Sequence, residues 1–221
     1  QDDGYWVKVS SDMALEHADA DPVSYDADGA VVYDIEYGNN LISYPFITTQ
    51  NVGDALGEAA ANIYAIAGEG VAALAINGGF VGSLTAFEGG KGYWLVSTDD
   101  FSFSFNGTAD GLARQTAPRA VPEVYSYSQS DQQAFFFVNS ATIRGEALES
   151  DDIVIAYNGD VIVGSRYWNG DFTDVSVMGE SYHQTTGELD EWTAGYMQSG
   201  DKVSFKVLDA STGELVDMDV E

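Results

Sequence analysis

The sequence predicts a mainly β protein with two β-rich domains, the first with one short helix and the second an antiparallel β-sandwich. Three features favour this fold: short runs of branched and aromatic residues, Asn-Gly pairs between such runs, and no long helical pattern in the second half. Such runs suit half-buried strands, and Asn-Gly suits tight hairpin turns. We place the domains at 24–108 and 123–221, with a linker at 109–122 and an N-terminal strand and acidic linker at 1–23.

In the first domain, polar and turn-forming residues separate the apolar runs. Helical spacing of apolar residues from Thr49 or Asn51 to about Ile66 predicts one helix, which Gly68 and Gly70 would end. The strands are expected at 30–37, 41–46, 71–76 and 79–87, with a hairpin turn at Asn77–Gly78.

The second domain lacks a helical pattern but contains several strand-like runs. Alternation or clustering of branched and aromatic residues predicts an antiparallel sandwich there. The expected strands are 135–138, 153–157, 160–164 and 202–207, with a tight turn at Asn158–Gly159.

A strand-like segment occurs twice. Residues 4–12 read GYWVKVSSD, and residues 92–100 read GYWLVSTDD. The second copy continues into 101–105, where Phe and Ser alternate with the period of a half-buried strand. Since no similar domain precedes the first copy, it resembles the last strand of a unit whose body is missing.

Three interpretations of this N-terminal strand remain open. It is a remnant of an upstream repeat, it pairs within the chain, or it completes a sheet in a neighbouring copy. The third would be strand addition, which satisfies the unpaired edge of a sheet and can produce polymers. The residues expected to form this assembly strand are Tyr5, Trp6, Val7 and Val9.

The 221 residues include 36 acidic and 8 basic side chains, which give a formal charge of −28 at pH 7. Because nucleic acids and anionic membranes bind Lys and Arg, we expect neither as a partner. No apolar run reaches the ~18 residues of a spanning helix, so we expect no membrane insertion. The chain has no cysteine and so forms no disulfide, while 45% hydrophobic residues suffice for buried cores.

Several phrases of the sequence resemble a known kind of module. In the first domain they are NLISYP at 40–45, IAGEG at 66–70, VGSL at 81–84 and GKGYW at 90–94. Together they resemble a repeat module of large secreted or surface proteins of environmental bacteria. Segments over 133–213 are similar to a β-sandwich module that often follows it. The resemblance implies an extracellular, modular, non-catalytic part used in adhesion, matrix or cell-surface architecture.

Clustered carboxylates mark candidate calcium sites, because calcium takes about six to eight oxygen ligands. The alternative in each case is a solvated acidic linker or a turn-forming Asp. Asp99 and Asp100 form a further candidate pair. The predicted metal ligands are Asp19, Asp21, Asp26 and Asp28 in the N-terminal linker, and Asp151, Asp152 and Asp160 in the second domain.

Aromatic residues in a Gly- and Asp-rich stretch of the second domain suggest a sugar-binding surface. Exposed rings stack on the faces of pyranose sugars, whereas buried rings serve as core or loop anchors. Tyr182 and Tyr196 lie in the same stretch. The residues predicted to bind polysaccharide are Tyr167, Trp168 and Trp192.

No motif for catalysis is present: the chain lacks a nucleophile elbow, a phosphate-binding loop and a zinc-protease motif. His17 and His183 are the only histidines, and both are expected at the surface. Asn106-Gly107-Thr108 is a formal glycosylation sequon, so Asn106 is a candidate attachment site.

We therefore expect a non-enzymatic extracellular or cell-surface structural protein. It would be a self-assembling subunit of a filament, adhesin or matrix, in contact with copies of itself or with neighbouring repeats. Calcium would neutralise facing acidic surfaces, since highly charged copies otherwise repel one another. The alternative is a carbohydrate-binding module of a secreted polysaccharide-degrading system.

Overall fold

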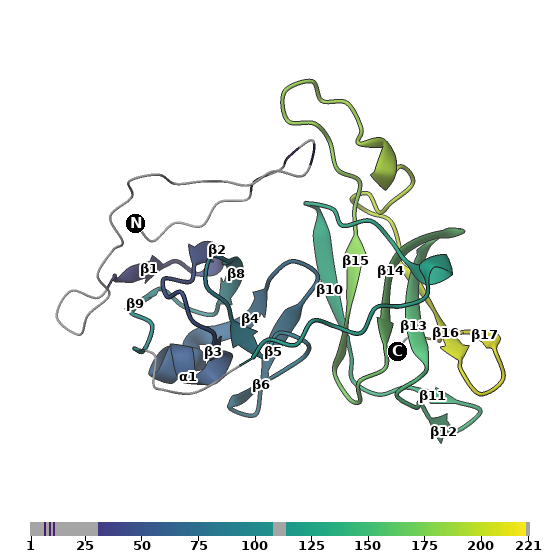
Figure 1. Cartoon of the computed structure of the whole chain (residues 1–221), viewed down its shortest axis with the longest axis horizontal. Helices are drawn as coiled ribbons and strands as arrows, with labels where there is room; N and C mark the ends of the chain where they lie inside the picture. Colours follow the sequence, from purple (N-terminus) through teal and green to yellow (C-terminus); the bar gives the residue numbers. More distant parts are fainter. Residues whose placement is uncertain (1–6, 8, 10, 12–30, 108–113, 220–221) are drawn as a thin grey trace. The chain divides into compact units, whose positions relative to one another are not determined.

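The computed structural model describes residues 7, 9, 11, 31–107 and 114–219. It confirms the mainly β fold class and divides into two compact units (Figure 1). Unit 1 contains Gln1–Gly68 and Ala73–Thr116, and unit 2 contains Glu69–Ala72 and Ala117–Glu221. The boundary between Thr116 and Ala117 falls inside residues 109–122, the expected linker.

Unit 1 contains a five-stranded sheet in the order β2-β8-β4-β5-β6 (Figure 1). Strand β8, the second copy of the repeated segment, lies inside this sheet and pairs antiparallel with β2 on one edge and with β4 on the other. The strands are β2 (Gly38–Ser43), β8 (Gly92–Ser97), β4 (Ile63–Ala67), β5 (Ala72–Ile76) and β6 (Gly79–Val81).

Two short strand pairs and one helix complete unit 1. They are β1 (Tyr33–Ile35) with β9 (Phe101–Phe103), β3 (Gln50–Asn51) with β7 (Ala86–Phe87), α1 (Val52–Leu56) and the 3-10 helix η1 (Gly57–Asn62).

Aromatic rings form the centre of unit 1. The ring of Phe105 lies 5.2 Å from that of Tyr33, and 5.3 Å from those of Tyr44 and Phe87. Phe103 is a fourth neighbour at 5.1 Å. Each such ring pair stabilises a fold by about 0.5–1.5 kcal/mol beyond the area it buries. The Phe-Ser alternation after β8 therefore supplies the core of this unit.

The predicted helix through Ile66 is wrong beyond Leu56. The α-helix ends there, η1 follows, and β4 begins at Ile63. A register shift between Ile63 and Ala65 lets both Ile63 and Ile66 turn into the core. Such a bulge inserts one residue in a strand, so it places buried residues three apart, which is also the spacing of a helix face.

One hairpin turn matches its prediction and another is shifted. Asn77 and Gly78 connect β5 to β6 with φ values of 53° and 79°, the positive pair that a type I′ turn requires. In unit 2, Asn158 pairs with Val161, so the two-residue loop is Gly159–Asp160 rather than Asn158–Gly159. Gly159 has φ 59° at the first loop position, which suits a glycine.

Unit 2 is sandwich-like. A four-stranded sheet and a two-stranded sheet enclose one main core, and short 3-10 helices and a small hairpin flank them. The four-stranded sheet has the order β14 (Val161–Tyr167), β13 (Ile153–Asn158), β16 (Ser204–Asp209) and β17 (Glu214–Asp217). The other elements are β10 (Gln133–Val138) paired with β15 (Thr173–Met178), β11 (Thr142–Ile143) paired with β12 (Glu146–Ala147), η2 (Glu123–Tyr125) and η3 (Glu191–Thr193).

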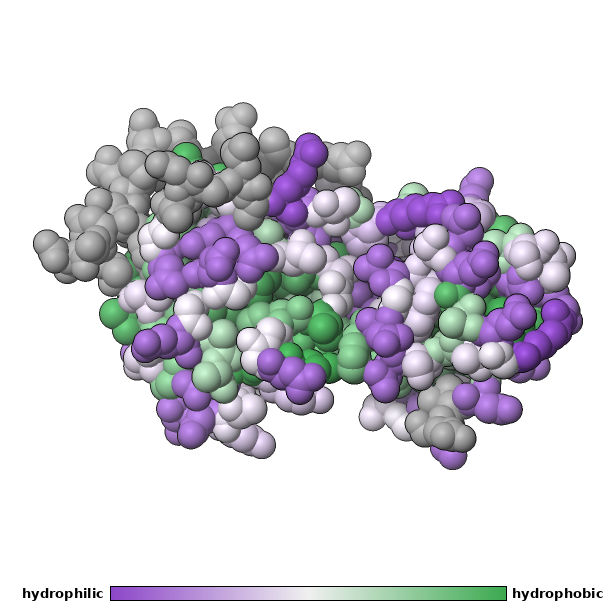
Figure 2. All heavy atoms as spheres, turned by 90° about the horizontal axis from the view of Figure 1, so that it is seen from below, coloured by the Kyte–Doolittle hydropathy of each residue, from purple (hydrophilic) through white to green (hydrophobic). Residues whose placement is uncertain are grey.

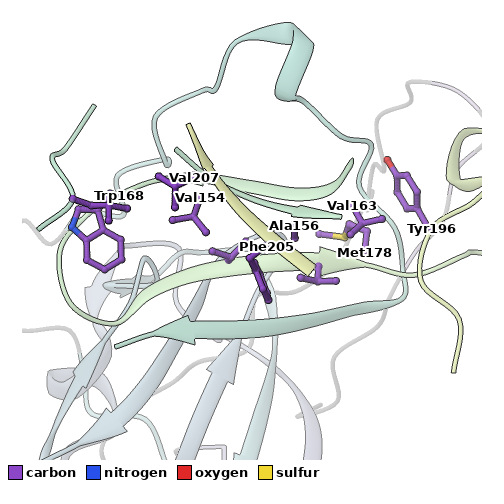
Figure 3. Close-up of a cluster of buried hydrophobic side chains, with 11 residues drawn as sticks. Val154, Ala156, Val163, Trp168, Met178, Tyr196, Phe205 and Val207 are labelled. Carbon is purple, nitrogen blue, oxygen red and sulfur yellow. The ribbon is translucent and has the colours of Figure 1, made fainter. Parts of the chain in front are cut away.

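Strand β13 is buried on both faces. On one face, Val154 and Ala156 join the main core beside Phe205 and Val163 (Figure 3). The opposite face packs against the segment that carries η2, and its buried members are Ile153, Ile155 and Tyr157. This two-sided burial explains why β13 reads as a continuous apolar run rather than an alternation.

Replacing Gly164 by alanine should destabilise unit 2. A Cβ at this position in β14 would overlap the carbonyl oxygen of Ser176 in β15, which cannot rotate away. We expect Gly164→Ala to lower the free energy of unfolding by about 3 kcal/mol or more, measured by urea denaturation. Gly79→Ala is the control, because its nearest neighbour would be 3.9 Å away. An equally small effect of both substitutions would contradict this packing.

Tyr93 of β8 should make stability depend on alkaline pH. Burial raises its pKa from 10 to about 12, although the Glu88 N–H donates a hydrogen bond to its hydroxyl. The unfolded chain would thus ionise near pH 10 while the folded chain stays neutral, so the Tyr93 contribution is complete below pH 10 and is lost as the pH rises towards 12. Tyr93→Phe should flatten this part of the stability profile, measured by denaturation from pH 8 to 11. Tyr64→Phe, at an exposed position, should leave it unchanged.

Candidate functional site

The second-domain carboxylates predicted to bind calcium do not form one site. Asp151 forms an ion pair with Arg119 at 2.6 Å. Asp152 is buried and accepts hydrogen bonds from the backbone N–H groups of Glu149 (2.7 Å) and Ala210 (2.9 Å). Asp160 lies in the loop at the other end of β13, so a six-residue strand of roughly 20 Å separates it from Asp152. The prediction of a joint site for these three residues is therefore wrong.

The remaining acidic candidates divide into those inside and those outside the described residues. Asp19, Asp21, Asp26 and Asp28 lie outside them. Asp100 accepts a hydrogen bond from the Tyr37 N–H at 2.7 Å, and Asp99 accepts one from the Asp100 N–H at 3.0 Å, as turn-forming Asp residues do. Within the described part of the chain, no group of three or more His, Cys, Asp or Glu side chains could hold a metal ion.

The three predicted sugar-binding aromatics have different environments. Trp168 is 7% exposed and belongs to the main core of unit 2, so it offers no ring face to a sugar, and its assignment is wrong (Figure 3). Tyr167 has the guanidinium of Arg119 over its ring at 3.7 Å, which covers one face. Trp192 on η3 is 54% exposed. The structure therefore does not bring these rings together as one platform.

Trp192 lies on a loop between Gly179 and Met197 that contains several internal hydrogen bonds. Inside it, the Ser181 hydroxyl donates to the buried Asp190 carboxylate at 2.7 Å. At its base, Glu180 accepts from the Tyr182 hydroxyl at 2.6 Å, and this hydrogen bond holds the pKa of Glu180 below its usual value. These hydrogen bonds order the loop, and the side chains that form them do not make up a catalytic site.

Asn106 contacts the end of α1. Its Nδ2 donates to the Asp54 carbonyl at 2.7 Å, and its backbone N–H donates to the Ala55 carbonyl at 2.8 Å. These bonds satisfy carbonyl groups that a helix end leaves unpaired. The nitrogen that would carry a glycan is thus already engaged, and glycosylation of Asn106 stays a prediction.

The expected assembly strand falls mostly outside the described residues. Tyr5 and Trp6 are among those not described. Val7 and Val9 are described, are 67% and 47% exposed, and are not assigned to a strand. Their exposure leaves two branched apolar side chains in contact with solvent.

Sequence reasoning missed a polar groove in unit 1. It has a volume of about 690 Å³ and lies between β3, α1 and β7, with Asn106, Gly107 and Arg114 on its other side. A second groove of about 660 Å³ runs between η1 and β9, and the two share Gly57 and Asn106. No motif indicated these grooves, because segments from four parts of the chain form them.

A buried ion pair stabilises unit 2. The Asp174 carboxylate lies 3.2 Å from Arg166 Nη2, and the two side chains are 3% and 8% exposed. Arg166 also donates to the carbonyl groups of Asp174 and Gly70, and Ala72 N–H donates to the Asp174 carboxylate. These bonds tie the short segment Glu69–Ala72 to the rest of unit 2.

Asp174→Ala should lower the stability of unit 2 by about 3–5 kcal/mol, because it leaves the Arg166 charge buried without its partner. The double variant Arg166→Met/Asp174→Leu should recover most of that loss, since it removes both charges. Urea denaturation followed by circular dichroism measures both effects. A loss below about 1 kcal/mol for Asp174→Ala would contradict the arrangement.

Within the described residues, no helix has the length and apolar character needed to cross a bilayer. Comparison of the chain with protein-family models, with curated proteins and with solved structures finds no match.

Proposed function

We propose that the chain is a non-enzymatic extracellular structural protein whose copies assemble by strand addition. In this proposal, residues 4–9 of one copy add to the unit 1 sheet of the next. One observation carries it: β8, whose first residues Gly-Tyr-Trp recur at 4–6, is an interior strand of a sheet and pairs on both edges. A second copy of such a sequence is suited to sheet pairing. The extracellular location rests on the resemblance to secreted modules.

The side-chain pattern of β8 indicates which residues of the copy would face a core. Tyr93 and Leu95 are buried, at 4% and 0% exposure, whereas Trp94 between them is 38% exposed. Tyr5 and Val7 match the buried pair, and Trp6 matches the exposed one. Since side chains alternate along a strand, this match predicts that Val7 faces the core of the partner.

The strand order of the unit 1 sheet favours β2 as the strand beside which the N-terminal segment of another copy adds. Strand β8 has two partners, and β4 is already paired with β5 on its other side. Among the described residues, no strand pairs with the outer edge of β2. The Tyr33 hydroxyl donates to the Ser43 carbonyl at the end of β2, which leaves residues 39–42 for an added strand. An open edge of this kind pairs readily with another chain.

The incoming N-terminal segment adds at a sheet edge more favourably than it exchanges with β8, because β8 already occupies its place in the sheet. Each copy already holds its own β8, with Leu95 and Val96 where the N-terminal segment has Val7 and Lys8. The resident strand is more apolar and belongs to the same chain. The incoming strand would therefore add beside β2 rather than replace β8.

The acidic surface should control this assembly. Hydrophilic residues are distributed over the visible face of the molecule, with apolar patches between them (Figure 2). Copies with a formal charge of −28 repel one another at low ionic strength, and salt or a divalent cation reduces that repulsion. Calcium bound by Asp19–Asp28 would bring this neutralisation close to the N-terminal strand.

Sedimentation velocity of the full chain over a range of concentrations tests the proposal. Val7→Asp should weaken self-association by at least about 100-fold, because it buries an unpaired carboxylate in the added strand. Trp6→Asp carries the same charge at the outward position and should leave association within about threefold of the original chain. Deleting residues 1–16 should yield folded monomers.

The comparison is made in millimolar calcium and in excess chelator, with folding checked by circular dichroism. Association that is strong in calcium and weak in chelator would support cation bridging. A full chain that remains monomeric in both, or equal effects of the two Asp substitutions, would contradict strand addition.

A further inference from the structure

Arg114 differs from the other arginines of the chain. Arg119, Arg144 and Arg166 each form an ion pair with a carboxylate. Arg114 has no ion pair or hydrogen-bond partner within the described part of the chain, although acidic residues outnumber basic ones by 36 to 8. Its guanidinium lines the polar groove of unit 1. A cation without a partner in so acidic a protein is available to a ligand.

Gln50 provides an independent observation in the same groove. The residue is 8% exposed, and its Oε1 accepts a hydrogen bond from the Tyr44 hydroxyl at 3.0 Å. That bond fixes the orientation of the side-chain amide: Oε1 is paired with Tyr44, and Nε2 is the remaining polar group. No described residue accepts a hydrogen bond from Nε2, while the side chain lines the groove. Nε2 is not completely buried, so its two N–H groups are accessible from the groove and can donate to a ligand there.

The other groups in the groove are mixed donors and acceptors. Asn51 accepts from the Gly53 N–H, and the Asp54 carboxylate lies one residue farther along α1. Among the described residues, no aromatic ring lines the groove. Its volume of about 690 Å³ is within the range of small-molecule sites, which is roughly 300–1,000 Å³. These donors and acceptors suit a ligand that carries hydroxyl groups, and the lining also offers apolar surface to the carbon faces of such a ligand.

We propose that this groove binds a short stretch of a glycan that carries both hydroxyl and carboxylate groups, such as a chain of hexuronate sugars. A sugar hydroxyl accepts from Gln50 Nε2, another donates to Asp54, and the sugar carboxylate pairs with Arg114. Asp54 repels a phosphate dianion more strongly than the single charge of a sugar carboxylate, and it accepts hydrogen bonds from sugar hydroxyls. The proposal does not depend on assembly by strand addition.

Isothermal titration calorimetry of the full chain with tetragalacturonate tests it, in about 0.15 M salt because the acidic chain and this anionic sugar otherwise repel each other. Arg114→Gln should weaken binding at least tenfold, because it removes the charge that pairs with the sugar carboxylate. Gln50→Glu should also weaken it at least tenfold, since it retains an acceptor for Tyr44 but loses the two N–H donors. Gln132→Glu makes the same change at an exposed position of unit 2 and should not alter the affinity.

Thermal melting of each variant verifies folding. Arg114 is exposed, so its substitution keeps the test informative even if Gln50→Glu does not fold. Xylotetraose, which has hydroxyls but no carboxylate, serves as the neutral probe and should bind at least tenfold more weakly. Absence of saturable tetragalacturonate binding would overturn the proposal, and so would equal affinity for the two sugars or unchanged affinity in Arg114→Gln.

Discussion

An interior strand in the largest sheet of each unit is the constraint on which the rest of the structure depends. In unit 1, β8 pairs with β2 and β4, and in unit 2, β13 pairs with β14 and β16. A central strand must satisfy backbone groups on both edges and pack on at least one face, so its sequence is the most restricted. Leu95 of β8 and Ile155 of β13 are fully buried for this reason. The two units thus differ in topology, but in both the sequence of an interior strand is the most restricted.

This constraint connects the fold to the proposed function. A segment with the pattern of an interior strand has apolar side chains that water accommodates poorly, and backbone groups that can pair with another strand. The N-terminal copy of β8 is such a segment, and Val7 and Val9 are exposed in the isolated chain. A surface of high negative charge opposes uncontrolled association, so strand pairing and charge act in opposite directions. The balance between them would make assembly responsive to salt or calcium.

The sequence predicted strands and turns better than sites, for physical reasons. Strand patterns and Asn77–Gly78 are local, and local chemistry determines them. Ile63 and Ile66 misled the helix prediction because a bulged strand and a helix share their spacing. Trp168 and Trp192 are alike in sequence, and only packing distinguishes a core ring from an exposed one. Gln50 had no signal, because its place in the groove results from contacts between distant segments.

Backbone amide exchange at residues 4–9, measured by nuclear magnetic resonance in concentrated and dilute samples, tests the central claim most directly. A strand added to the edge of β2 pairs on one side only, so every second amide is hydrogen-bonded. The account predicts slow exchange at alternate residues in the concentrated sample and fast exchange throughout 4–9 after dilution. Fast exchange at all of these residues in both samples would contradict it.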